Sequence, residues 1–125
     1  MNLHKNQFLF SSRLKFLFMI MIKKDFIGEN HLVFSFPEEK RFSFLVAREM
    51  RNEMLRIPEK KDMKITIDLE RIHFVDSAGF DFLVDMVREA ERCQFDFELV
   101  HVLPEVTELV KLLHLENVLG LCENC

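Results

Sequence analysis

The stretch of sequence that decides the fold covers residues 64–80 and reads KITIDLERIHFVDSAGF. Its first half alternates, with Ile65, Ile67 and Leu69 on one side, as expected for a β-strand with one buried face. A further, mostly apolar segment follows at residues 72–75, and the tetrapeptide Asp-Ser-Ala-Gly comes directly after it at residues 76–79. The stretch therefore predicts a strand that leads through a short polar turn into a helix.

Amphipathic helices are predicted on both sides of this stretch. After the turn, a helical spacing of i, i+3, i+4, i+7 and i+10 relates Phe80, Leu83, Val84, Val87 and Ala90. Before the stretch, a spacing of four residues relates Phe42, Val46, Met50 and Met54. Because about 3.6 residues make one helical turn, each set forms one apolar stripe along its helix, and this stripe is expected to face the core of the domain.

The remaining elements complete an alternating order of strands and helices. Residues 31–36 read as a strand that Pro37 ends, and residues 95–102 read as another strand. Pro104 suits the first position of a last helix, and residues 118–121 suit a short final strand. The order β, α, β, α, β, α predicts an α/β fold, in which helices cover a mixed sheet of four to five strands.

The length and the charge distribution limit the possible functions. One domain is expected from 125 residues, and a hydrophobic content of 49% is enough for a folded core. Residues 1–24 hold five basic side chains and no acid, so residues 25–125 hold 12 basic and 21 acidic side chains and a charge of −9. Such an acidic body does not favour nucleic-acid binding, which needs lysine and arginine against phosphates.

Residues 1–24 form a basic, apolar leader ahead of the domain predicted for residues 25–125. The apolar run at residues 16–22 is too short to span a bilayer, which takes about 20 residues, and no small-x-small cleavage site follows it. Three interpretations stay open: the first strand of the sheet behind an unstructured leader, an anchor at a membrane surface, or a natural start at Met19 or Met21. We favour the first combined with the third, and we expect no membrane contact.

The three cysteines do not have the number or spacing of a disulfide framework, which indicates a cytoplasmic protein. Two of them, Cys122 and Cys125, form a C-x-x-C pair at the C-terminus. A zinc site needs two further ligands, and the available His101 and His114 belong to different predicted elements. We therefore expect free thiols, and neither a metal site nor a cofactor.

Ser77 in the polar turn is the candidate functional residue. We expect it at the N-cap of the helix, where Ser77→Ala would cost about 1 kcal/mol if the residue is only a cap. The same position suits a phosphate, because a helix start has unpaired N–H groups and a partial positive charge. Gly79 leaves the backbone open to close approach, whereas Asp76 would repel the added charge. Ser77 is therefore a candidate for reversible phosphorylation that changes the affinity for a partner.

A catalytic role for Ser77 is not favoured. A nucleophile elbow reads G-x-S-x-G, and Val75 stands where its first glycine belongs. The candidate bases His73 and His101 come from adjacent strand regions and form no recognisable acid-base-nucleophile cluster. We expect a binding protein and not an enzyme.

On these residues the chain resembles the STAS domain family, and within it the anti-sigma-factor antagonists. The family pattern is a strand with Asp-Leu, an apolar pair, Asp-Ser-x-Gly and a helix, and the match lies in Asp68-Leu69, Phe74-Val75 and residues 76–79. The resemblance covers about residues 30–121. It implies that the unphosphorylated form binds an anti-sigma factor that is also a serine kinase, and so frees the sigma factor. Phosphorylation of Ser77 would end the binding, and a metal-dependent serine phosphatase would restore it.

The resemblance also implies a partner-binding surface on the turn and the helix after it. Its expected members are Asp76, Ala78, Gly79, Phe80, Asp81 and Val84. The chain departs from the family in one place, because Phe-Pro-Glu-Glu-Lys at residues 36–40 replaces a Gly-x-Leu-Asp-like turn that lies near the serine. Lys40 there would stabilise a phosphate, and Glu39 would oppose it. A second interpretation is a constitutive STAS adaptor subunit, for example of a lipid-transporter ATPase assembly, which docks without phosphorylation.

Overall fold

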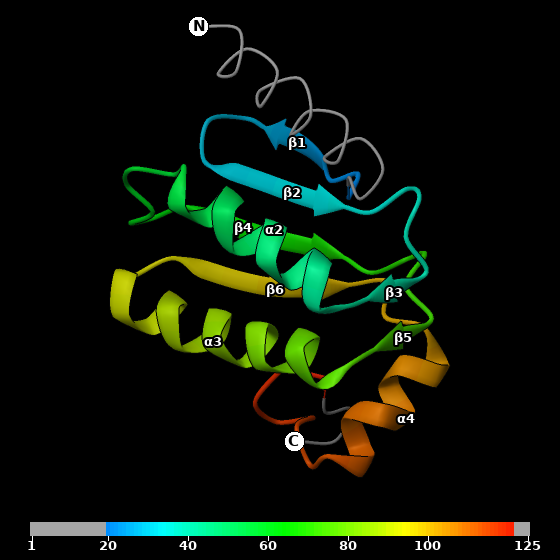
Figure 1. Ribbon diagram of the computed structural model, residues 1–125. Helices are drawn as coiled ribbons and strands as arrows, with labels where there is room; N and C mark the ends of the chain where they lie inside the picture. The colour runs from blue at the N-terminus through cyan, green and yellow to red at the C-terminus, as the bar shows by residue number, and fades with distance from the viewer. Residues whose placement is uncertain (1–19, 122–125) are drawn as a thin grey trace, which may run out of the picture.

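The computed structural model describes residues 20–121 of the chain. In chain order the elements are β1 (Lys23–Ile27), β2 (His31–Ser35), β3 (Arg41–Phe42), α2 (Phe44–Leu55), β4 (Lys64–Asp68), β5 (Phe74–Val75), α3 (Ser77–Cys93), β6 (Asp96–Val100) and α4 (Pro104–Leu112). The predicted alternation of strands and helices is confirmed. Figure 1 shows the elements stacked as a sheet with helices packed against it.

The main sheet has four strands in the order β1-β2-β4-β6. β1 runs antiparallel to β2, whereas β2, β4 and β6 run parallel to one another, which confirms the predicted mixed sheet. The connections β2–α2–β4 and β4–α3–β6 step in the same direction, and right-handed crossovers then place both helices on one face. Figure 1 shows α2 and α3 side by side on that face.

The core lies between the sheet and these two helices. In β2 the side chains alternate: Leu32 and Phe34 are buried, while the other three residues of the strand are partly exposed. The helices bring the predicted stripes against them, including Val46, Met50 and Leu83, each at most 1% exposed. Burial of this apolar surface is the main force that fixes the layers.

A second, two-stranded sheet pairs β3 with β5 in parallel, beside the starts of α2 and α3. Phe42 belongs to β3 and not to the helix that its spacing predicts; α2 begins two residues later, at Phe44. The ring of Phe42 is fully buried and stacks on Phe82 of α3, with 5.8 Å between ring centroids. The pair β3–β5 therefore fixes where both helices begin.

The two chain ends differ from the sequence-based expectation. Among the described residues the first strand is β1, and residues 20–22 of the apolar run at 16–22 are not in a strand, while residues 16–19 lie outside the described residues. Every residue of β1 is exposed, and this edge strand is held by backbone pairing with β2. A strand without a buried face shows no hydropathy pattern in the sequence. Residues 116–120 form turns where a final strand was expected at residues 118–121, since local hydrogen bonds such as Leu119 N to Leu115 O close them.

Two further expectations concerned the C-terminal cysteines and the membrane. The C-x-x-C pair predicted to hold free thiols lies outside the described residues. Within residues 20–121, no helix has both the length and the apolar character needed to cross a bilayer.

Candidate functional site

The N-cap of α3 is Asp76 and not Ser77, which corrects the expectation from the sequence. Asp76 has the extended backbone of a cap, and its Oδ1 accepts a hydrogen bond from Gly79 N at 2.8 Å. Both side-chain types are good caps, but the helix begins at Ser77, so the preceding residue holds the capping position. The exposed Ser77 makes no side-chain hydrogen bond within residues 20–121.

The Asp76 carboxylate joins the two helices as well as capping one of them. Its Oδ2 accepts a hydrogen bond at 3.1 Å from the N–H of Phe44, the first residue of α2. Its own N–H donates to Phe42 O at 3.2 Å. One carboxylate therefore holds the N-terminal ends of α2 and α3 together, and both helix ends carry partial positive charge. Ser77 lies at this junction.

Gly79 is required by packing at the same junction. A Cβ built on Gly79 would lie 2.5 Å from Phe42 O and 2.8 Å from Val75 Cγ1. Distances this short do not occur between non-bonded atoms, and a backbone oxygen held in β3 has little room to move. The glycine of the Asp-Ser-Ala-Gly turn thus lets α3 pack directly on β3.

The residues expected to bind a partner divide into two groups. Asp81 is exposed, and Ala78 and Val84 are partly buried on α3. Gly79 and Phe80 are buried, with Phe80 only 5% exposed and part of the core. These two residues therefore lie beneath the surface that Asp76, Ala78, Asp81 and Val84 reach.

Two exposed aromatic residues beside the turn were missed by the sequence analysis. Phe44 is 59% exposed and Phe74 is 41% exposed, although large apolar side chains are usually buried. Arginine guanidinium groups lie over both rings, Arg48 at 6.0 Å from the Phe44 centroid and Arg41 at 4.9 Å from that of Phe74. The available signal was that neither ring belongs to a predicted apolar stripe. We call Phe44, Phe74, Arg41 and Arg48 the aromatic patch.

The segment that departs from the family pattern lies beside the residues that precede Ser77. Lys40 O accepts hydrogen bonds from His73 N at 2.7 Å and from Phe74 N at 3.3 Å. Lys40 is exposed, and its ammonium group has no ion pair among the described residues. The backbone of Lys40 therefore holds the residues that lead into β5, beside its own exposed charge.

The two histidines considered as bases are each paired with a carboxylate. His73 Nδ1 lies 3.1 Å from Glu105 Oε2, and this hydrogen bond is the largest cause that lowers the pKa of Glu105. His101 Nδ1 lies 3.1 Å from Asp68 Oδ1. Neither histidine bonds to Ser77 in the part of the chain that the structure describes. The two histidines considered as bases are thus both held by other residues and away from Ser77.

Known proteins with the same architecture were compared with this chain. A sulfate transporter family protein from Wolinella succinogenes has a TM-score of 0.65 and 15% identity, over 79% of this chain and 77% of that one. The anti-sigma factor antagonist SpoIIAA in its unphosphorylated form gives 0.61 and 16%, over 78% and 84%. A murine solute carrier 26 family anion transporter gives 0.54 and 12%, over 80% of this chain and 20% of that one. At these identities the likeness is one of fold.

The sequence itself assigns the family. No curated protein matches the chain. Residues 25–125 match the family described as the STAS domain, which is most of the chain and includes the whole junction around Ser77. The chain belongs to the STAS domain family.

Proposed function

We propose that this protein is an anti-sigma-factor antagonist, a cytoplasmic binding module that reversible phosphorylation of Ser77 switches off. The observation that carries the proposal is the exposed hydroxyl of Ser77, which no residue of 20–121 bonds, at the junction of two helix starts. The shared fold with an anti-sigma factor antagonist supports it. The partners are an anti-sigma factor serine kinase and a metal-dependent serine phosphatase, and no catalysis by this chain is involved.

The negative charge of a phosphate on Ser77, and not only its size, would change the junction between the two helices. A phosphate on Ser77 would bring about −1.5 to −2 charges next to the Asp76 carboxylate. The oxygens of Asp76 already occupy the N–H groups of Gly79 and Phe44, so the phosphate meets a like charge where these donors are engaged. Repulsion between the two groups therefore acts on the contacts that hold α2 against α3.

The aromatic patch is the surface that we assign to the unphosphorylated state. Phenylalanine and arginine are both enriched at protein interfaces relative to the rest of the protein surface. The kinase would contact Phe44 and Phe74 together with the exposed face of Ser77. A phosphate on Ser77 adds negative charge to this end of the helices, which opposes the binding of an acidic partner surface.

The experiment is a pull-down from native lysate with wild-type, Ser77→Ala and Ser77→Asp chains as baits, read by mass spectrometry. Asn52→Asp is the matched control, because Asn52 is exposed within α2 and the change adds the same charge away from α2's start. We expect a kinase-like anti-sigma factor on wild-type, Ser77→Ala and Asn52→Asp, and its loss on Ser77→Asp. If Ser77→Asp retains this partner, the phospho-switch is wrong.

A constitutive STAS adaptor is the second candidate. It is favoured by the likeness to a sulfate transporter family protein and to an anion transporter, since STAS folds also occur in those proteins. In that case all four baits would retain the same partner equally, for example the ATPase of a lipid transporter, and Ser77 would have no regulatory role.

A further inference from the structure

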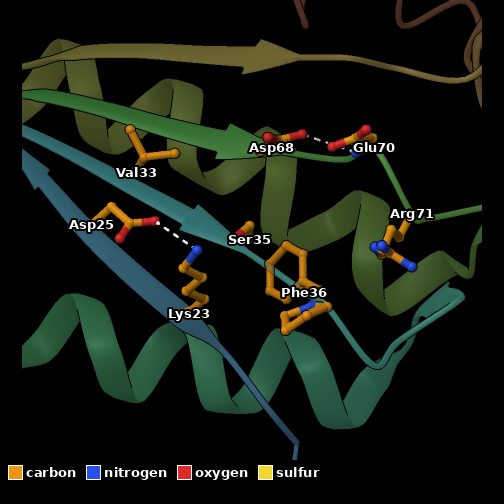
Figure 2. A pocket seen from close by; sticks show the side chains of 9 residues that line it. Lys23, Asp25, Val33, Ser35, Phe36, Asp68, Glu70 and Arg71 are labelled. Carbon is orange, nitrogen blue, oxygen red and sulfur yellow. Dashed lines mark hydrogen bonds and ion pairs between the residues drawn. The ribbon is translucent and has the colours of Figure 1, made fainter.

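The carboxyl ends of β4 and β6 bring together three side chains that can bind metal ions. These strands are parallel neighbours, with Asp68 opposite Val100, so His101 follows directly beside Asp68. Glu70 is two residues beyond Asp68, and its N–H donates to Asp68 Oδ1 at 3.0 Å, which turns the chain back toward that carboxylate. Figure 2 shows Asp68 and Glu70 next to each other at the end of the strand.

We propose that Asp68, Glu70 and His101 bind one divalent transition-metal ion of the zinc type. Each residue offers one ligand atom, and these three atoms lie within 4.8 Å of one another. Two ligands on a tetrahedral ion, with bonds of about 2.0–2.2 Å, lie about 3.5 Å apart. Closing that difference takes only small rotations of Glu70 and His101, which are both exposed.

The ligand types favour a transition metal over calcium or magnesium. One imidazole nitrogen with two carboxylate oxygens is a donor set for ions of the zinc type, whereas calcium and magnesium prefer oxygen alone. The nitrogen comes from a different strand than the two carboxylates, so an ion would join β4 to β6. The imidazole of His101 distinguishes this cluster from a group of surface carboxylates, which would offer oxygen ligands only.

A cavity lies against the two carboxylates of the cluster, and His101 is not part of its wall. Its volume is about 330 Å³, and its walls include Asp68, Glu70, Lys23 and Arg71. Figure 2 shows Lys23 paired with Asp25 across this space from β4. Three protein ligands leave an open site on a metal ion, and the cavity has room there for water or for an anion that Arg71 attracts.

The test is a Co²⁺ titration of the full chain, followed by the visible absorption of the bound ion. Glu70→Gln is the mildest variant, because it keeps the backbone N–H on Asp68. His101→Gly has its own control in His114→Gly, since the two histidines have the same left-handed backbone, with φ of 54° and 56°. Asp96→Asn is the carboxylate control, at the opposite end of β6.

We expect one Co²⁺ per chain, bound through nitrogen and oxygen, and a dissociation constant raised about tenfold or more by Glu70→Gln and by His101→Gly. His114→Gly and Asp96→Asn should bind as the wild type does. Circular dichroism of each variant separates lost binding from lost folding. The proposal is wrong if no ion binds, if the ligand variants bind normally while folded, or if thiolate absorption shows that the cysteines hold the ion. None of these outcomes depends on phosphorylation of Ser77.

Discussion

Asp76→Ala should destabilise the fold far more than Ser77→Ala. The change removes the hydrogen bond to Gly79 N, a lost N-cap that costs about 1 kcal/mol. It also removes the bond to Phe44 N, worth about 1 kcal/mol for an exposed contact. The total of about 2 kcal/mol lowers the melting temperature by about 10 °C in a domain of this size. Ser77→Ala removes no side-chain hydrogen bond seen among residues 20–121, so its free energy of unfolding should stay within about 0.5 kcal/mol of the wild-type value.

Denaturant unfolding followed by far-ultraviolet circular dichroism measures both changes. Asp76→Asn is the intermediate case, because asparagine remains a good N-cap but has one acceptor oxygen in place of two. We expect the order wild type, Ser77→Ala, Asp76→Asn, Asp76→Ala from most to least stable. If Ser77→Ala lost as much stability as Asp76→Ala, the serine would be the cap, and the double role assigned to Asp76 would be refuted.

Three further predictions concern packing, the aromatic patch and pH. Gly79→Ala should cost about 3 kcal/mol by overpacking against Phe42 O; Gly28→Ala, with open space but φ of 69°, should cost less in the same unfolding assay. Phe44→Ala should weaken capture of the partner at least tenfold while the melting temperature stays near that of the wild type, which pull-down and thermal unfolding measure together; equal capture would remove Phe44 from the interface. The Glu105 carboxyl should titrate below its ordinary pKa in NMR spectra, and His73→Ala should return it toward that value. Since this pKa is lower in the folded chain, the contact stabilises the fold above the ordinary carboxyl pKa and is lost as the pH falls through the folded value; an unchanged Glu105 pKa in His73→Ala would contradict the pairing.

Local patterns in the sequence were sufficient for most of the architecture. Alternation in β4 and the stripes of α2 and α3 are repeated over many residues, so each element is specified several times over. The polar segment at residues 76–79 marked the point where a strand gives way to a helix, although α3 already begins at Ser77 and only Asp76 lies outside it. The fold class and the position of Ser77 at the start of α3 followed from these features.

The ends of the sheet were less predictable for a physical reason. β1 is held by backbone pairing with β2, and this pairing leaves no hydropathy pattern in the exposed residues of β1, so the sequence did not indicate a strand at Lys23–Ile27. Residues 118–121 are apolar because Leu119 packs into the core from a turn, and burial alone does not distinguish a turn from a strand. In β1 and at residues 118–121 strand pairing and apolar character do not coincide, and hydropathy reports only the second.

The sequence by itself determined the order of elements, the family and the serine in its turn, because these depend on neighbours a few residues apart. Only the tertiary structure decided which atoms meet. Asp76 bonds Phe44, 32 positions away in the chain, and Gly79 touches the backbone of Phe42. The same holds for His101 beside Asp68, 33 positions apart. Such contacts depend on how the crossovers stack α2 and α3 on one face and align β4 with β6, and no local pattern encodes that arrangement.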